Sequence, residues 1–355
     1  GEIAIRIART ARRMGIKTYV VRTAKEPEAV YLSAADAVIN FPETDGNIPE
    51  FLDIDRLVGL AREYKIDSLH PGYGYLSENA ELAERCRDNG IVFIGPSPEV
   101  IRLMGDKVAA KGIAAQSGVP MLGASQGAVH TLDEARKIAK RLGYPVIIKA
   151  VSGGGGRGMR IVHHQDELEQ LYKIATAEAQ VAFNDPSVFI EKYLENPKHI
   201  EFQIVADNYG NVVHLGEREC SIQRKHQKLM EEAPSPALDE RLRKKMAAAA
   251  VSLAKQAGYQ SLGTVEFLLD HQKHFYFMEM NTRIQVEHPV TEEITGIDLV
   301  ELQFNIAAGR KLPLRQSQRL VYRMPDQRRG RTSRIFSQYR CYPSTSFTTR
   351  QSHPH

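Results

Sequence analysis

The chain has 355 residues, 42% hydrophobic and 25% charged, which is the balance of an ordinary soluble protein with room for two or three domains. No apolar run is long enough to span a membrane, no signal-peptide pattern opens the chain, and three widely spaced cysteines exclude a disulfide framework, so we expect a cytoplasmic location. The net charge of +4 is unevenly placed, because the residues from Ser317 onward carry +7 and the remainder −3. Nothing in the main body therefore predicts a nucleic-acid partner.

The chain opens with a predicted helix, in which Ile3, Ile7 and Ala11 share a face and Gly15 marks the end. Short apolar strands then alternate with amphipathic helices, which predicts a parallel, doubly wound sheet. Because such a unit normally begins with a strand, we expect an N-terminal strand to be missing. The predicted strands are Thr18–Val21, Ala37–Ile39, Ser68–His70 and Val92–Ile94, and the predicted helices are Asp55–Tyr64 and Ala80–Asn89.

The motif HPGYGYLSEN, His70–Asn79, follows one of these strands at its carboxyl end, where open α/β sheets bind ligands. Its glycines permit close approach of a ligand, and Tyr73 and Tyr75 offer flat faces. A plain tight turn is the alternative interpretation.

A second domain begins near Met104, with a helix at Asp133–Leu142 and a strand at Tyr144–Ala150 that carries Lys149 near its end. The sequence SGGGGRGM, Ser152–Met159, follows. Four consecutive glycines leave backbone N–H groups free to bind phosphate. The spacing is neither that of a P-loop nor that of a Rossmann motif, and a flexible hairpin loop remains the alternative.

Two further segments follow in the second domain. Phe189–Asp207 predicts two strands with a turn at Asn196–Pro197, and Glu201 and Gln203 share a face of the second strand. Gly216–Pro236 brings several cations together, which indicates either an anion site or a solvated loop. These cations are Arg218, Arg224, Lys225, His226 and Lys228.

Between the predicted helices Arg241–Ala257 and Ile297–Ala308 lies a hairpin of two apolar runs, Gly263–Leu269 and Phe275–Met280, around a polar break at Asp270–His274. A symmetric turn places Asp270 opposite Phe275 and Glu266 opposite Glu279, with Asn281 and Arg283 on the face of Glu279. Two facing carboxylates repel each other unless a cation joins them, and with an amide oxygen they suit Mg²⁺ or Mn²⁺. A solvated polar face with incidental charges is the alternative.

Six motifs in this order resemble those of biotin carboxylases, the ATP-grasp components of acetyl-CoA carboxylase and its relatives, from Gly1 to about Gln316. The resemblance implies an α/β and α+β fold, with a Rossmann-like pre-ATP-grasp domain followed by an ATP-grasp domain with a lid. The domains would be residues 1–103, lacking the first strand, and 104–316, with the lid at about 122–194; residues 317–355 would be an unfolded tail. The motifs are HPGYGYLSENA, IRLMGDK, YPVIIKA–SGGGGRGM, EKYLENPKHIE, ERECSIQRKHQK and EMNTRIQVEHPVTE.

The resemblance also implies roles for individual residues. Tyr73 and Arg283 would bind biotin; Glu266, Glu279 and Asn281 would bind two Mg²⁺ or Mn²⁺ ions; Lys228, Arg283, Gln285 and Val286 would hold bicarbonate. Arg283, Glu287 and Lys228 would be catalytic, with Glu287 taking the bicarbonate proton. ATP would meet Lys107, Lys149, Gly153, Gly154, Gly155, Gly156, Gly158, Met159, Glu191, Lys192, Leu194, His199, Gln223, His226, Glu266, Leu268 and Glu279.

The activity implied is the first half-reaction of acetyl-CoA carboxylase, used in fatty acid biosynthesis, or of a related carboxylase. Bicarbonate attacks the γ-phosphate of ATP to give carboxyphosphate, and the CO₂ released then carboxylates N1 of biotin on a biotin carboxyl carrier protein. A carboxyltransferase and a second copy of the chain, forming a homodimer, would be the other partners. Two alternatives are another ATP-grasp ligase, such as a carbamoyl-phosphate synthase-like protein, and a non-catalytic nucleotide-binding or assembly subunit.

Beyond about Gln316 the resemblance stops. Where the family has the sequence ECRINAED, whose arginine would stabilise the biotin enolate, this chain has RMPDQRRGR. Codons for ECRINAED read one nucleotide early spell Met324 to Arg331 in order, so we interpret the segment as the product of a frameshift near Ser317. A natural arginine-rich tail is the alternative.

Overall fold

The computed structural model describes residues 1–23, 28–41, 50–151, 159–224, 227–312 and 337–338. In this part of the chain no helix combines the length and the apolar character needed to cross a membrane.

The first lobe alternates helices and short strands, as the sequence predicts. The strands form two separate parallel pairs, β1 with β2 and β3 with β4, whereas one continuous sheet was expected. A cavity of about 510 Å³ lies between them, lined by residues of β1, β3 and the start of α1. The elements are α1 (Glu2–Arg13), β1 (Tyr19–Arg22), η1 (Val30–Ala34), β2 (Ala37–Asn40), η2 (Glu50–Leu52), α2 (Ile54–Glu63), β3 (Ser68–Leu69), α3 (Ala80–Asp88) and β4 (Val92–Phe93).

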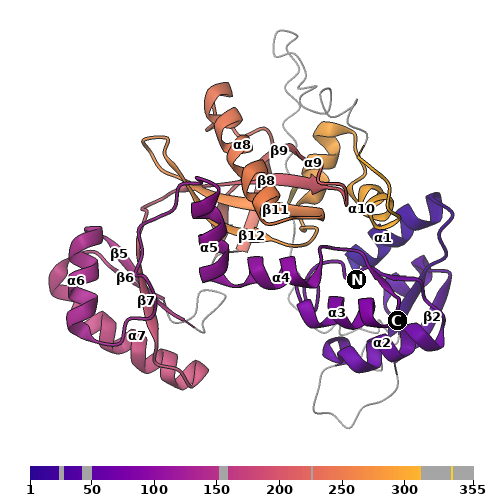
Figure 1. Cartoon of the computed structure of the whole chain (residues 1–355), viewed down its shortest axis with the longest axis horizontal. Coiled ribbons are helices and arrows are strands. Elements are labelled where there is room, and N and C mark those ends of the chain that lie inside the picture. Colours follow the sequence, from indigo (N-terminus) through magenta and orange to yellow (C-terminus); the bar gives the residue numbers. More distant parts are fainter. Residues whose placement is uncertain (24–27, 42–49, 152–158, 225–226, 313–336, 339–355) are drawn as a thin grey trace, which may run out of the picture.

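Two helices, α4 (Pro98–Gly105) and α5 (Lys107–Gln116), connect this lobe to the rest of the chain (Figure 1). The Ser97 hydroxyl accepts the Val100 N–H at the start of α4, and the Asp106 carboxylate accepts two N–H groups at the start of α5. These caps satisfy donors that a helix N-terminus leaves free, so both helices begin where the sequence supplies a capping side chain.

A small lobe stands apart from the main body at the left of Figure 1. Its three antiparallel strands lie in the order β6-β5-β7, and two helices pack on them through a separate apolar cluster that includes Ile148, Leu168 and Ile190. The elements are α6 (Leu132–Leu142), β5 (Val146–Ala150), β6 (Met159–Val162), η3 (Gln165–Glu167), α7 (Leu168–Phe183) and β7 (Val188–Lys192).

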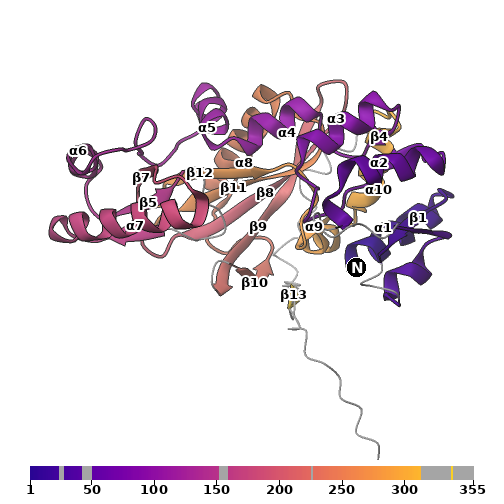
Figure 2. The same cartoon turned by 90° about the horizontal axis from the view of Figure 1, so that it is seen from below.

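A six-stranded antiparallel sheet forms the centre of the molecule, with strand order β12-β11-β8-β9-β10-β13. Helix α8 covers one face, and α9 and α10 contact the other (Figures 1 and 2). The elements are β8 (Lys198–Ala206), β9 (Val212–Arg224), β10 (Gln227–Glu232), α8 (Glu240–Gln256), β11 (Ser261–Leu269), β12 (Phe275–Asn281), α9 (His288–Thr295), α10 (Leu299–Ala307) and β13 (Ser337–Gln338).

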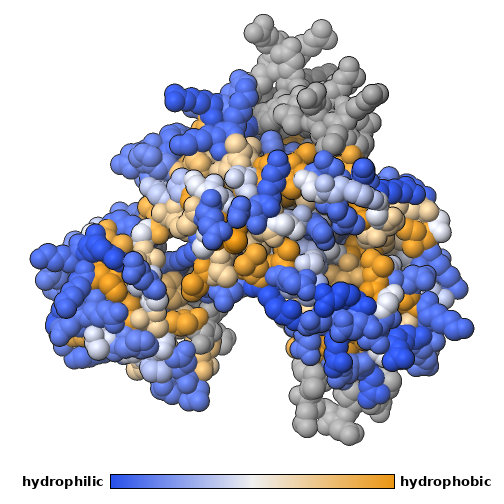
Figure 3. Space-filling view, in the orientation of Figure 1, coloured by the Kyte–Doolittle hydropathy of each residue, from blue (hydrophilic) through white to orange (hydrophobic). Residues whose placement is uncertain are grey.

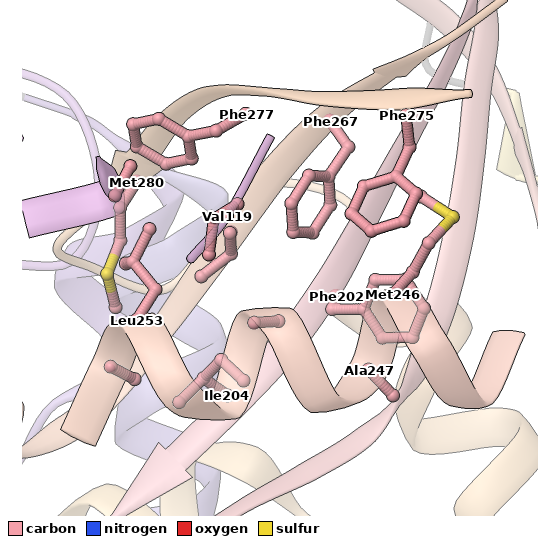
Figure 4. Close-up of a cluster of buried hydrophobic side chains, with 14 of the residues drawn as sticks. Val119, Phe202, Ile204, Met246, Ala247, Leu253, Phe267, Phe275, Phe277 and Met280 are labelled. Carbon is pink, nitrogen blue, oxygen red and sulfur yellow. The ribbon is translucent and has the colours of Figure 1, made fainter. Parts of the chain in front are cut away.

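The two faces of this sheet differ in chemistry. Phe202 of β8 and Phe267 of β11 point to α8 and pack in the largest apolar cluster with Met246 (Figure 4). Because side chains alternate along a strand, their neighbours Glu201 and Glu266 lie on the opposite face. Both glutamates are buried, so the second face is a polar interior rather than a solvated surface.

The hairpin of β11 and β12 has the predicted pair Glu266 and Glu279, but the turn is one residue out of the expected register. Phe275 pairs with Leu269, not with Asp270, and a β-bulge between the Phe267–Phe277 and Glu266–Glu279 pairs restores the alignment. A bulge inserts one unpaired residue, here Met278, and shifts the side-chain alternation. Phe275 and Phe277 therefore face the apolar cluster, while Glu279 and Asn281 lie on the polar face with Glu266.

We expect the close fit of Tyr259 over β11 to make Gly263→Ala destabilising. An added Cβ would lie 2.4 Å from the Tyr259 hydroxyl oxygen, and this tyrosine is fully buried. Overpacking of this kind costs about 1–3 kcal/mol. Urea unfolding monitored by circular dichroism measures the loss.

The matched control is Gly59→Ala in α2, where an added Cβ meets nothing within 4 Å. Alanine in a helix interior is favoured over glycine by roughly 0.5–1 kcal/mol, so this variant is expected to be more stable than the parent chain. Equal effects of the two substitutions would contradict the packing argument.

Candidate functional site

A cavity of about 680 Å³ lies where α5, the small lobe and the β11–β12 hairpin meet. The space-filling view shows the molecule hollowed between the small lobe and the body, with hydrophobic side chains on the walls (Figure 3). Eight residues that the sequence assigns to the site line it, namely Lys107, Lys149, Met159, Glu191, Leu268, Glu279, Asn281 and Arg283. Cations, carboxylates and apolar side chains thus line the same cavity.

Glu266 and Glu279 face each other across the hairpin, and Glu279 lines this cavity. Burial opposes ionisation of Glu266, but the hydrogen bond from His199 and the charge of Lys228 outweigh it and hold the pKa of Glu266 well below its usual range. Burial and then the negative charge of Glu266 raise the pKa of Glu279. The ionised form of Glu279 is therefore disfavoured in the fold.

Lys228 of β10 joins three carboxylates of the polar face. Its Nζ lies 2.5 Å from Glu201, 2.9 Å from Glu266 and 2.6 Å from Glu287. Burial lowers the pKa of Lys228, but these three negative charges outweigh it and raise the pKa far above its usual range. Lys228 is therefore charged and already paired.

Arg218 of β9 forms the second half of this cluster and is fully buried. Its guanidinium donates to Glu201 at 2.6 Å, Gln203 at 2.9 Å and Gln285 at 2.8 Å. Arg218 and Lys228 are paired with protein carboxylates, and the anion site expected at these cations stays a prediction. The sequence analysis saw Arg218 only as one of several cations, because its partners lie 15 to 67 residues away.

His199, Gln223 and Gln285 complete the polar face. Gln223 lies 2.9 Å from Nδ1 of His199, whose Nε2 lies 2.8 Å from Glu266. The amide of Gln285 donates to the same carboxylate at 2.9 Å, as does that of Asn281 at 2.8 Å. Glu266 is thus held in one orientation by four side chains.

Arg283, the second residue after β12, is held by hydrogen bonds to its surroundings. Nε donates to Glu78 at 3.0 Å, and the two terminal nitrogens donate to Asn281 at 3.1 Å and to the carbonyl of Ile284 at 3.2 Å. Glu78 belongs to the HPGYGYLSEN motif and was not among the predicted site residues. Through Glu78 the first lobe contributes a side chain to the cavity lining.

Glu191 of β7 is clamped by two lysines, Lys149 at 2.5 Å and Lys111. Burial works against ionisation, but the two cations outweigh it and lower the pKa of Glu191. Both ammonium groups also lie over the ring of Phe189, at 5.5 and 5.8 Å from its centre. Lys111 was not predicted, because an isolated lysine within a helix carries no signal in a sequence.

Several predicted site residues lie elsewhere. Lys192 donates its ammonium group to the carbonyls of Gly143 and Tyr144 and, like the half-buried Leu194, does not line the cavity. Tyr73 lines the other cavity and donates to Glu2 at 2.7 Å, so it does not share a cavity wall with Arg283. The turn before α9 contains Val286, which is half-buried, and Glu287, which is buried. Six further predicted residues lie outside the described part of the chain, namely Gly153, Gly154, Gly155, Gly156, Gly158 and His226.

Two family descriptions match the chain. Residues 1–101 match the biotin carboxylase N-terminal domain, and residues 106–315 match the ATP-binding domain of the carbamoyl-phosphate synthase L chain. The second match covers more than half of the chain.

Curated relatives agree with the first description. The chain is 54% identical to biotin carboxylase of Nostoc sp. over 318 residues, 90% of this chain and 71% of that protein. It is 51% identical to chloroplastic biotin carboxylase 1 of Populus trichocarpa over 316 residues, 89% of this chain and 60% of that protein. The chain thus spans between three fifths and three quarters of the length of these relatives.

Solved structures show the same fold. The biotin carboxylase of Campylobacter jejuni, in a β,γ-ATP complex, superposes with a TM-score of 0.84 at 46% identity and covers 89% of this chain and 71% of that one. The biotin carboxylase domain of Hydrogenobacter thermophilus 2-oxoglutarate carboxylase, a dimer with MgADP, ADP and bicarbonate, gives 0.81 at 48% identity, with coverage of 88% and 69%. The fold is therefore a pre-ATP-grasp domain followed by an ATP-grasp domain with a lid, and the chain belongs to the biotin carboxylase family of ATP-grasp ligases, the enzymes of ATP-dependent biotin carboxylation.

Proposed function

We propose that this chain carries the site for carboxylation of biotin on a carrier protein, with ATP and bicarbonate as co-substrates. The observation that carries the proposal is the facing pair Glu266 and Glu279, of which Glu279 lines a cavity that also holds Lys107, Lys149 and Arg283. An acidic pair and a set of cations in one space suit a metal–nucleotide complex, whose metal ions need the acids and whose phosphates need the cations.

The charges of the described residues fit a divalent cation. Glu201, Glu266 and Glu287 are paired with two cations, Arg218 and Lys228, and Glu279 adds a further carboxylate. Glu266, Glu279 and Asn281 supply the hard oxygen atoms that Mg²⁺ or Mn²⁺ prefers, and we infer that they hold two such ions with the nucleotide. The ions would neutralise charge on the phosphates during transfer.

The residues of the chain divide the remaining work. Arg283 and Lys228, with Gln285 and the backbone at Val286, hold bicarbonate near the nucleotide. Glu287 accepts the bicarbonate proton as it attacks, because Lys228 at 2.6 Å keeps this carboxylate in place. Lys149 and Lys107 bind phosphates, and carboxyphosphate forms within the cavity, where contact with water is reduced.

Partners follow from this proposal. The biotin substrate is carried by a biotin carboxyl carrier protein, and a carboxyltransferase uses the product; a homodimer is proposed by similarity to the dimeric Hydrogenobacter domain. Tyr73 and Arg283 remain the proposed biotin contacts, and a cytoplasmic location remains a prediction.

We expect Glu279→Gln to separate metal binding from stability. Loss of one of two facing carboxylates weakens Mn²⁺ binding in the presence of ADP, measured by electron paramagnetic resonance, and lowers ATP cleavage by at least about 10²-fold. The metal-free variant is expected to be more stable, since the raised pKa of Glu279 shows that its ionised form is disfavoured in the fold.

Glu240→Gln is the control, because Glu240 is exposed on α8 and pairs only with Lys244 among the described residues. Unchanged Mn²⁺ affinity in the Glu279 variant would show that the hairpin pair is not the metal site.

The second prediction concerns residues 317–355, which follow the family match. The chain as given lacks the ECRINAED sequence, and enolate-type contacts are worth about 10²–10³ in rate. We expect slow bicarbonate-dependent ATP cleavage with almost no transfer of ¹⁴C-bicarbonate to free biotin. Cleavage that ignores bicarbonate would instead favour a different ATP-grasp ligase, and no cleavage a nucleotide-binding subunit.

Restoring the reading frame by one nucleotide near the Ser317 codon is expected to recover carboxyl transfer. Transfer at full rate by the chain as given, or an adjacent frame without an ECRINAED-like sequence, would overturn the frameshift interpretation.

A further inference from the structure

Glu78 is a carboxylate of the first lobe that reaches into the nucleotide cavity. It lies in the loop between β3 and α3 and lines the cavity together with Glu279 and Arg283. Its partners are about 205 residues away in the chain. The contact therefore depends on the two lobes being packed together.

The carboxylate of Glu78 binds two consecutive residues after β12. Oε1 accepts the backbone N–H of Thr282 at 2.8 Å and the Thr282 hydroxyl at 3.2 Å, and Oε2 accepts Nε–H of Arg283 at 3.0 Å. One oxygen thus holds the backbone and the other holds the side chain. Rotation of Arg283 about its last side-chain bonds would break the second contact without moving the first.

The other donors of Arg283 are directed by this arrangement. A guanidinium has five N–H groups in one plane. Three of them donate to Glu78, Asn281 and the Ile284 carbonyl, so the plane is fixed and, among the described residues, two N–H groups have no acceptor. Arg283 lines the cavity and is about one fifth exposed, so these groups can meet an anion there.

We propose that Glu78 is a positioning residue for bicarbonate, acting through the orientation of Arg283, so that the first lobe completes the anion site. This inference rests on the proposed function, in which Arg283 holds bicarbonate. Glu78 itself repels the anion and does not touch it. Glu78 instead holds the planar guanidinium of Arg283 in one orientation. Less conformational entropy is then lost when bicarbonate binds.

The test compares Glu78→Gln and Glu78→Ala with the parent full-length chain in bicarbonate-dependent ATP cleavage. Alanine is expected to raise KM for bicarbonate about tenfold while KM for ATP changes less than twofold. Glutamine keeps an acceptor for Thr282 but loses the charge beside Arg283, so an intermediate rise is expected. Glu84→Gln is the control, since Glu84 pairs with Arg87 and Arg102 on the surface of the same lobe.

The readout independent of turnover is the Nε–H signal of Arg283 in a ¹H–¹⁵N spectrum, assigned with an Arg283→Lys variant. We expect it to be protected from solvent exchange in the parent and lost in both Glu78 variants. A parallel rise of KM for bicarbonate and KM for ATP, or an Nε–H signal that persists in the Glu78 variants, would overturn the positioning role. Glu78 would then only hold the two lobes together. If the parent cleaves ATP without regard to bicarbonate, the proposed function is wrong, and the Nε–H signal alone then decides whether Glu78 orients Arg283.

Discussion

The buried ion cluster of Arg218, Lys228, Glu201, Glu266 and Glu287 is the constraint on which the rest of the site depends. Charges removed from water cost several kcal/mol each unless every one is paired and hydrogen-bonded. The cluster meets this condition by drawing its members from four neighbouring strands and from the turn before α9. Loss of one member leaves the charge of another unpaired. The cluster therefore requires both its five residues and the strand order that brings them together.

The cluster also explains why the polar face of the sheet is rigid before any ligand arrives. Glu266 accepts hydrogen bonds from His199, Lys228, Asn281 and Gln285, which fixes its orientation. Phosphoryl transfer depends on positioning and on charges already in place, so this rigidity is a functional property. The apolar face contributes to this rigidity as well, because Phe202 and Phe267 pack the same two strands against α8 (Figure 4).

The sequence predicts those features that depend on short-range patterns. The helices α1 and α8 and the β11–β12 hairpin were expected from periodicity, capping and turn residues, and their observed bounds differ by one or two residues. The division of the first sheet into two pairs was not expected, since alternation of strands and helices gives no information on which strands are neighbours. Arg218 was recognised as a cation but not as a buried one, because burial depends on partners supplied by distant strands.

Residues of the candidate site likewise fall into those that a sequence motif identifies and those that depend on contacts between distant segments. Lys107, Lys149, Glu279 and Arg283 stand in recognisable motifs, and the structure places them around one cavity. Lys111 stands in no motif, and the role of Glu78 could not be read from its motif, because the contacts of both residues join segments distant in the chain. Lys192 also stands in a motif, but its ammonium group donates to backbone carbonyls, and its contact with ATP stays a prediction.

The β-bulge at Met278 means that the site is encoded by residue count as well as by residue identity. Before the bulge, β12 presents Phe275 and Phe277 to the core; after it, Glu279 and Asn281 lie on the face of Glu266 and line the cavity. Removing one residue here would leave every acid and amide in the sequence while exchanging the two faces of the strand's second half. The carboxylate of Glu279 would then meet the apolar core, and Met280 would lie on the face of Glu266. A comparison of site residues would not detect this change, although it would disrupt the arrangement of the site.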